Sequence, residues 1–144
     1  MTTQIRQALE AVGTTLTDIH GVGVITAARI IGEVGDIRRF SSKHQFAAGN
    51  GTAPIPVASG RTDRHRLNRG GNRRLNRAIH VIARTQAAWH PEAKTYMDKK
   101  GAEGKTRAEA LRCLKRRLSD IVYRTLIEDH NLTIRHAMAT PGAA

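Results

Sequence analysis

Residues 52–84 have the sequence TAPIPVASGRTDRHRLNRGGNRRLNRAIHVIAR, which joins a proline-containing segment to a run of arginines. Pro54 and Pro56 hold the backbone extended and remove two hydrogen-bond donors, which predicts a rigid loop or an edge strand. Ser59 and Gly60 follow this segment directly. The residues after them are polar and lack apolar periodicity, so we expect a loop there that becomes ordered on binding.

The second half of the stretch is predicted to be a two-faced helix that begins after Asn72, a good N-cap residue. At about 100° per residue, an apolar stripe and a basic stripe fall on roughly opposite sides. The apolar stripe comprises Leu75, Ile79, Ile82, Ala83 and Gln86, and the basic stripe comprises Arg73, Arg77, His80 and Arg84. A basic face is often only a solvated face, but this one contains no acids, which favours phosphate binding.

The charge of the stretch indicates a polyanionic partner. Eight arginines stand against one acid, Asp63: Arg61, Arg64, Arg66, Arg69, Arg73, Arg74, Arg77 and Arg84. The whole chain of 144 residues carries a formal net charge of +12, which favours nucleic acid or an anionic membrane surface. No apolar run approaches the roughly 20 residues of a membrane-spanning helix. We therefore expect nucleic acid, no membrane contact and a cytoplasmic location.

Residues 16–36 resemble a helix-hairpin-helix. Gly21 and Gly23 allow a tight turn and leave backbone N–H groups uncovered at the start of the second helix, where they can bind a phosphate. His20 occupies a position where such hairpins often carry proline. The alternative is that the turn merely joins two packed helices.

The remaining segments predict a mainly α fold, with a helix-hairpin-helix lobe followed by a proline-stiffened loop and a small helical bundle. Four further helices are expected: residues 3–12, a short helix capped by Ser42 and Gln45, a helix from Pro91 to about Lys100, and a long amphipathic helix over 106–129. Residues 133–144 are predicted to be a flexible tail. The whole chain, 1–144, is interpreted as a single domain.

The order of these parts resembles the C-terminal domain of the IS-one-ten family of bacterial insertion-sequence transposases, serine transposases that are guided by a structured bridge RNA. The resemblance covers residues 16–126, and its most specific parts are Gly51–Pro54, Ser59 with Gly60, and Gly71–Leu75. It implies that Ser59 is a nucleophile that attacks a DNA backbone phosphate. Guanidinium groups can stabilise the charge that develops there, and the candidates are Arg61, Arg64, Arg66, Arg73 and Arg74.

The resemblance also implies binding partners and a further domain that this chain does not contain. The partners are double-stranded DNA, a bridge RNA and further copies of the full-length protein, in the bacterial nucleoid. Relatives carry an N-terminal RuvC-like domain whose four acids bind a divalent metal, and the acids of this chain do not reproduce that set. We therefore expect a piece of a longer protein that contains no cofactor and no metal site. Alone, it is expected to bind nucleic acid without recombining DNA.

Other classes of protein remain as alternatives. One is a non-catalytic helix-hairpin-helix module, as in repair or nucleoid proteins, and another is a ribosomal or RNA-structural protein. Tyr96 and Tyr123 could suggest a tyrosine recombinase, but both lie on helical stretches remote from the arginines. The histidines lack the close spacing of a zinc motif. Cys113, the sole cysteine, is expected to be a buried, reduced thiol.

Overall fold

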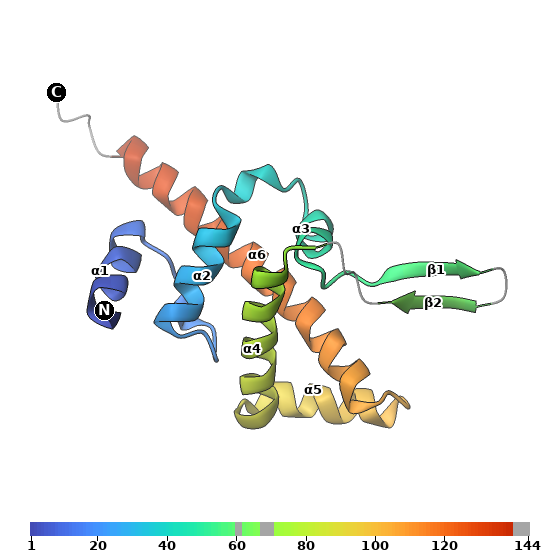
Figure 1. Cartoon of the computed structure of the whole chain (residues 1–144). Coiled ribbons are helices and arrows are strands. Elements are labelled where there is room, and N and C mark those ends of the chain that lie inside the picture. The colour runs from blue at the N-terminus through green and yellow to red at the C-terminus, as the bar shows by residue number, and fades with distance from the viewer. Residues whose placement is uncertain (60–61, 67–70, 140–144) are drawn as a thin grey trace.

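The structure, a computed structural model, describes residues 1–59, 62–66 and 71–139, and within 55–59 and 62–66 it describes the backbone alone. Most of these residues are helical, which confirms the predicted mainly α fold (Figure 1). The elements are α1 (Thr2–Val12), η1 (Leu16–Asp18), α2 (Val24–Val34), η2 (Ile37–Arg39), α3 (Lys43–Asn50), β1 (Ile55–Ser59), β2 (Thr62–Arg66), α4 (Arg73–Trp89), α5 (Pro91–Ala102) and α6 (Arg107–Ala139), where η marks a 3₁₀ helix.

The long helix α6 organises the helical body, since α3, α4 and α5 all pack against it. Its apolar side is buried at Leu114, Leu118 and Val122, facing the fully buried Phe46 of α3 and the buried stripe of α4. All five residues of the apolar stripe predicted for α4 are buried, which confirms that prediction. Each fully buried Leu or Ile side chain contributes roughly 1.5–3 kcal/mol relative to an exposed one.

The predicted helix caps are present. The Ser42 hydroxyl accepts a hydrogen bond from the backbone N–H of Gln45 at 3.2 Å, and the Asn72 side chain accepts one from Leu75 at 3.0 Å. Pro91 occupies the first turn of α5, as expected. These caps satisfy backbone donors that a helix leaves unpaired at its start.

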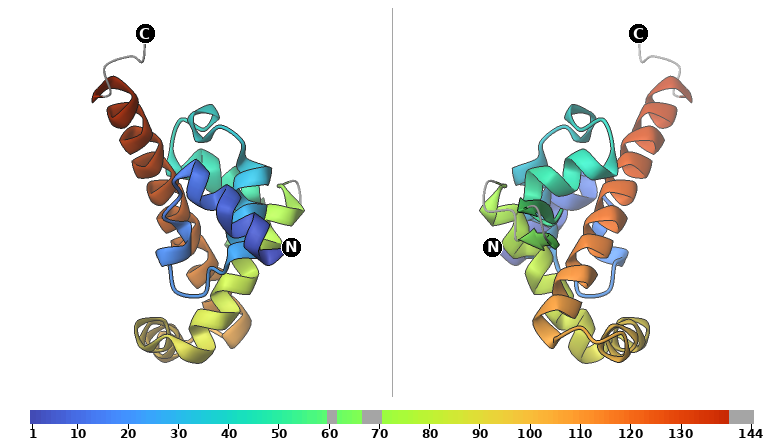
Figure 2. Two further views of the ribbon diagram at one scale, coloured as in Figure 1. Left: turned by 90° about the vertical axis from the view of Figure 1, so that its left-hand side faces the viewer. Right: turned by 90° about the vertical axis from the view of Figure 1, so that its right-hand side faces the viewer.

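Helix α6 is longer than predicted. The predicted helix over 106–129 extends to Ala139, so the part of the expected flexible tail within 133–139 is helical. No proline or glycine interrupts Arg107–Ala139, so nothing in the local sequence ends the helix earlier. Residues 131–139 are all exposed, and Figure 2 shows this end of α6 projecting beyond the other helices.

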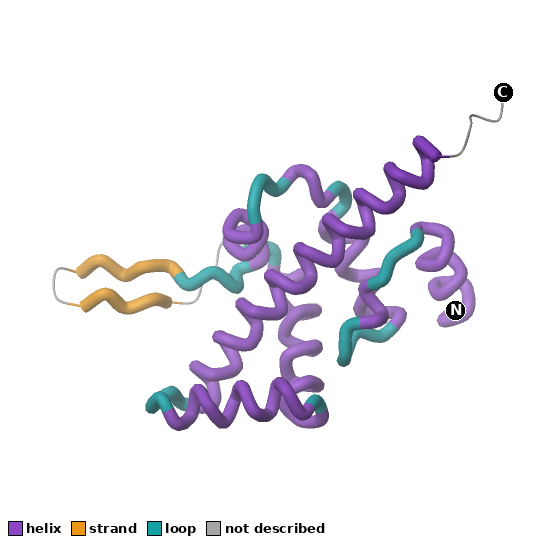
Figure 3. Tube along the Cα trace, turned by 180° about the vertical axis from the view of Figure 1, so that it is seen from behind, coloured by secondary structure: helices purple, strands orange, loops and turns teal. Residues whose placement is uncertain are grey.

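The segment predicted as a proline-stiffened loop and a polar loop is a β-hairpin. Strands β1 and β2 pair antiparallel, with Pro56 opposite His65 and Ser59 opposite Thr62. Figures 1 and 3 show that the hairpin stands away from the helical body, so neither strand needs a buried apolar face. Because strand prediction depends on an alternating apolar pattern, the polar strand β2 was not predicted. In a two-stranded sheet both strands are edges, which tolerates Pro56.

The expected helix-hairpin-helix is formed only in part. Its first helix is a single 3₁₀ turn, Leu16–Asp18, and its second helix is the full α2. Residues 14 and 15 are tied to α6 instead, since Asp129 accepts hydrogen bonds from the backbone N–H and the hydroxyl of Thr15 at 2.9 and 2.7 Å. These bonds explain why the chain turns here rather than continuing a helix.

Candidate nucleic-acid interface

Ser59 is the last residue of β1, at the end of the hairpin that lies farthest from the helices (Figure 1). Its Cα partner in β2 is Thr62. The predicted DNA contacts Arg64 and Arg66 belong to β2, where their backbones lie opposite Val57 and Ile55. Gly60 and two further predicted contacts, Arg61 and Arg69, lie outside the described residues.

The base of the hairpin is held by a buried polar network. Asn50, at the end of α3, has no exposed surface, and its side-chain oxygen accepts hydrogen bonds from the backbone N–H and the hydroxyl of Thr52 at 3.0 and 2.6 Å. Its amide group donates to the Ser119 hydroxyl of α6 at 2.9 Å. Each of these buried groups would cost about 1–3 kcal/mol if left without a partner. Thr52, which leads into β1, is therefore fixed to two helices.

Helix α4 joins the same network. The Asn76 side chain donates to the backbone carbonyl of Asn50 at 3.0 Å and accepts from the Lys115 ammonium group at 2.9 Å. The network thus links α3, α4 and α6 around the point where the chain enters the hairpin. Sequence reasoning missed it, because its members come from segments remote in the chain.

The chain returns from the hairpin at the same place. A Cβ atom on Gly71 would lie 2.4 Å from the backbone nitrogen of Gly51, so only glycine fits this approach of two backbones. The backbone N–H of Asn72 donates to the carbonyl of Gly49 at 2.7 Å. The Asn72 side chain also donates to Glu33 of α2 at 2.9 Å. The start of α4 is therefore locked to α2 and α3.

The basic stripe predicted for α4 lies on the surface. Arg73, Arg77 and Arg84 are exposed, and His80 is half-buried. Burial, followed by the nearby charges of Lys115, Arg84 and Arg77, lowers the pKa of His80, so the imidazole is neutral at neutral pH. The positive charge of this face therefore comes from the arginines.

Arg74, also exposed, differs from the other arginines of α4 because it has an acidic neighbour. Its guanidinium lies 3.6 Å from the Glu33 carboxylate, but its side chain is 86% exposed, so solvent screens the pair. Among the described residues, no other arginine of α4 forms an ion pair. This face is therefore a candidate for phosphate contact.

The two glycines in the turn of the predicted helix-hairpin-helix, Gly21 and Gly23, differ in role. Gly21 has φ 88°, and a Cβ there would lie 3.3 Å from the Ile82 carbonyl of α4, so this glycine serves packing. Gln86 donates to the carbonyl of His20 at 2.7 Å, which explains the glutamine within the apolar stripe. Gly23 is exposed, has open space around it and is the N-cap of α2. Its backbone stays the candidate for phosphate contact.

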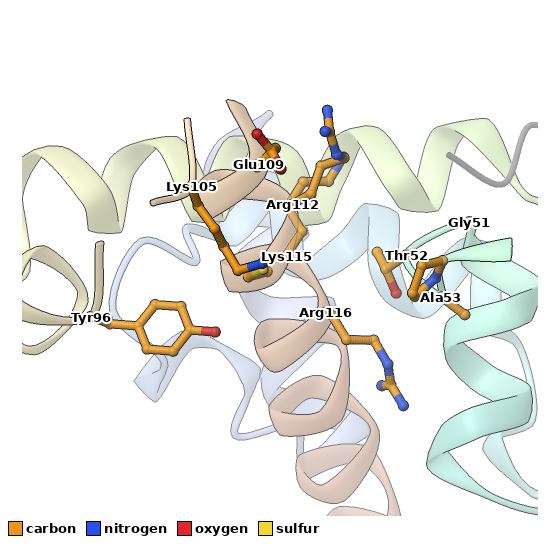
Figure 4. A pocket seen from close by; sticks show the side chains of 11 residues that line it. Gly51, Thr52, Ala53, Tyr96, Lys105, Glu109, Arg112, Lys115 and Arg116 are labelled. Atoms are coloured by element: carbon orange, nitrogen blue, oxygen red, sulfur yellow. The ribbon is translucent and has the colours of Figure 1, made fainter. Parts of the chain in front are cut away.

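A basic cavity, which the sequence did not predict, lies beside the base of the hairpin (Figure 4). Residues 51–54 form one wall, and side chains of α5 and α6 form the other. The one available signal was the basic residues that flank the apolar stripe of α6. Cys113 lines this cavity and is half-buried, so the expectation of a buried thiol was wrong.

The tyrosines have structural surroundings. Tyr123 lies 5.7 Å, ring to ring, from Phe46, and its hydroxyl donates to the Phe40 carbonyl at 3.5 Å. The Arg117 guanidinium lies 5.0 Å from the Tyr96 ring centre, and burial raises the pKa of the Tyr96 phenol. Neither arrangement activates a phenol as a nucleophile.

Comparison with known proteins decides the family. The chain matches the model of the Transposase IS116/IS110/IS902 family over residues 13–98. It is 38% identical over 127 residues to a 43.6 kDa protein of insertion element IS110 from Streptomyces coelicolor, which covers 85% of the chain and 31% of that protein.

The chain belongs to the IS116/IS110/IS902 transposase family.

Two further relatives agree with this assignment. A 42 kDa protein of insertion element IS900 from Mycobacterium paratuberculosis is 33% identical over 90% of the chain and 32% of its own length. A 44.8 kDa protein of IS116 from Streptomyces clavuligerus is 31% identical over 77% of the chain and 28% of its length. The predicted resemblance to the IS-one-ten family is thus confirmed, and the chain spans about a third of the curated relatives it matches.

The described part of this IS110-family chain offers neither a metal centre nor a membrane span. In the part of the chain that the structure describes, no three His, Cys, Asp or Glu side chains gather closely enough to hold a metal ion. None of the helices described is long and apolar enough to cross a bilayer.

Proposed function

We propose that this chain is the part of an IS110-family transposase that supplies Ser59 as the nucleophile for DNA strand cleavage and exchange. Membership of the transposase family supports the reaction class. The observation that carries the proposal is the position of Ser59. It ends β1 at the far end of a hairpin whose base is anchored in three helices, so its backbone stands away from the body.

The proposed chemistry conserves the energy of the phosphodiester. The Ser59 oxygen forms a bond to phosphorus while the bond from phosphorus to one sugar oxygen breaks. The hydroxyl proton leaves to solvent or a base, and the released sugar oxygen takes up a proton. Attack of another sugar hydroxyl on the phosphoserine reverses the step and joins a new strand, so no ATP is required.

Arginines are proposed to hold the DNA in place. Guanidinium groups match the geometry of phosphate oxygens and stay charged at every physiological pH. Arg73, Arg77 and Arg84 form an exposed positive face on α4, directly after the hairpin returns to the body. Gly23 presents the backbone at the start of α2, where helix N–H groups can bind a phosphate.

The remaining parts of the function involve more than this chain. We propose double-stranded DNA as the substrate and a structured bridge RNA as the guide. Strand exchange requires at least two active centres, so the working protein is proposed to be an oligomer. A divalent metal is assigned to an acidic, RuvC-like domain elsewhere in the full-length transposase.

The test removes one hydroxyl from each strand of the hairpin. Ser59→Ala is introduced into the full-length transposase, with Thr62→Ala, its partner in the register, as the matched control. DNA strand exchange and a denaturation-resistant protein–DNA adduct are measured. We expect S59A to abolish both while DNA affinity stays within about twofold, and T62A to retain both.

A different result would assign the chain to another class. If S59A recombines DNA at the rate of the unaltered protein, Ser59 is not the nucleophile. The chain would then be a nucleic-acid-binding module of the transposase.

A further inference from the structure

The cavity beside the base of the hairpin has the size of a ligand site. Its volume is about 410 Å³, within the range of roughly 300–1,000 Å³ that is usual for small-molecule pockets. Thr52 and Pro54 lie on one side, where the chain leaves α3 for β1. Figure 4 shows the opposite side formed by Tyr96 of α5 and by residues of α6 and the turn before it.

The charge of this cavity is strongly unbalanced. Four cationic residues line it against one carboxylate: Lys105, Arg112, Lys115 and Arg116 against Glu109. Arg116 is paired with Asp120. In the described part of the chain, the side chains of Lys105 and Arg112 have no ion-pair or hydrogen-bond partner. Glu109 interacts electrostatically with both, but one carboxylate cannot offset all the cations of the cavity, so an excess of positive charge remains.

Within this cavity, Lys115 is a buried cation without an acidic partner among the described residues. It is 8% exposed, and its ammonium group donates to the neutral amide oxygen of Asn76 rather than to a carboxylate. Burial, and secondarily the charge of Arg112, lowers the pKa of Lys115. A buried ammonium beside a second cation is stabilised when an anion approaches. This side chain therefore favours an anionic occupant.

Two further residues of the cavity wall act in opposite directions: Tyr96 suits an anionic occupant, and Glu109 opposes one. The pKa of Tyr96 is raised by burial, so its phenol keeps its proton and can donate a hydrogen bond. Figure 4 shows its hydroxyl directed toward the wall that carries Lys115 and Arg116. Glu109 is held at the rim by a capping box, in which it accepts from the Thr106 backbone at 3.3 Å. The pKa of Glu109 is lowered by these bonds, so it opposes an anion.

We propose that this cavity binds a backbone phosphate of the DNA on which Ser59 acts, a proposal that rests on the function proposed above. Pro54 at the rim precedes Ser59 by five positions in the extended chain, which corresponds to about 17 Å. A duplex that lies along the hairpin passes about five base pairs over that length. The cavity thus fixes the register of the DNA relative to the nucleophile.

The experiment compares two arginines of one helix. Arg112→Gln removes a cation of the cavity, and Arg124→Gln removes an exposed cation of α6 outside it. Binding of the 144-residue chain to a labelled duplex is followed by fluorescence anisotropy between roughly 50 and 200 mM salt. We expect R112Q to bind about tenfold more weakly and to lower the salt slope by about 0.9, the value for one phosphate contact. R124Q is expected to change neither quantity, and circular dichroism checks that both variants fold.

Glu109→Gln tests whether a more positive cavity binds the duplex more tightly. Glutamine can replace glutamate in a capping box, so the start of α6 is retained while the opposing charge is removed. We expect duplex affinity to rise by about twofold to threefold. If R112Q equals R124Q, or if E109Q lowers affinity, the cavity is not a phosphate site.

Binding to a labelled RNA hairpin is measured in parallel, to distinguish a phosphate of DNA from a phosphate of RNA. If R112Q weakens RNA binding and leaves duplex binding unchanged, the proposal for DNA is wrong. In the full-length transposase, adduct formation by R112Q should recover at saturating DNA, because its defect is in binding. Adduct formation by S59A should not recover, so the two proposals fail in distinguishable ways.

Discussion

The base and the tip of the β-hairpin lie in different surroundings. At the base, Thr52 and Ser119 are buried and both are hydrogen-bonded to the buried Asn50, and Gly71 fits against the backbone of Gly51. At the tip, the backbone of Ser59 lies opposite Thr62 of the neighbouring strand and stands away from the helices. Under the proposed function, the nucleophile must reach a large substrate, and its position must also be reproducible. The fold places the buried network at one end of a single pair of strands and the backbone of Ser59 at the other.

The largest effect on stability is expected at the centre of the base. Asn50→Ala removes the buried partner of the Thr52 and Ser119 hydroxyls, while the Thr52 backbone N–H keeps its bond to Ala47, and the change should lower the free energy of unfolding by about 3 kcal/mol. The control is Asn131→Ala on the exposed end of α6, where alanine should be neutral or slightly stabilising. Urea unfolding followed by circular dichroism measures both. Equal stability of the two variants would contradict a rigid base.

A pair of glycine substitutions sharpens the comparison. Gly71→Ala places a Cβ against the backbone of Gly51 and should cost about 1–3 kcal/mol. Gly32→Ala adds the same methyl group within α2, where nothing lies within 4 Å, and should stabilise the helix by about 0.5–1 kcal/mol. Thermal melts should move in opposite directions. If both melts rise, the two ends of the hairpin do not meet as described.

Lys115 provides a pH-dependent test of the base. Because its pKa is lowered in the folded protein, the folded state releases this proton at a lower pH than the unfolded state, whose lysine has a pKa near 10.5. The penalty for burying the charge is present below the lowered pKa and disappears as pH rises toward 10.5. The stability of the unaltered chain relative to Lys115→Met should therefore increase over this alkaline range. A difference that stays constant with pH would show that the ammonium group is not buried at a cost.

The smallest effect is expected at the tip. Ser59→Ala should change the free energy of unfolding by less than about 0.5 kcal/mol, since surface substitutions away from packed features rarely cost more. The same urea titration used for Asn50→Ala measures it. A loss near that of N50A would mean that the tip contributes to the folded body, and the contrast between the two ends would fail.

Local signals in the sequence predicted much of the helical body. Ser42 and Asn72 cap helices as their residue types indicate, and the stripe of α4 packs as its spacing indicates. The resemblance that depended on Gly51–Pro54 and Gly71–Leu75 led to the correct family. The structure adds a reason for Gly71 in that pattern, because no other residue allows the chain to return so close to Gly51.

Features that depend on distant segments could not be predicted. Strand β2 lacks apolar alternation, which agrees with a backbone that stands away from the helices, and the end of α6 lacks an apolar stripe, which agrees with the exposure of residues 131–139. The basic cavity needs residues 51–54 beside α5 and α6, and no local pattern places them together. Whether Ser59 and the arginines of the hairpin converge on one phosphate stays a prediction.

The length of the hairpin can vary within this family because the chain returns at Gly71 to the point where it left the helices. Since Asn72 donates to Gly49, the whole hairpin is inserted between two points that already touch. Doubling the length of such an insertion costs only about 0.6 kcal/mol of closure entropy. The hairpin can therefore be lengthened or shortened during evolution without disturbing the helices, and under the proposed function such a change would shift Ser59 along the DNA without a new fold.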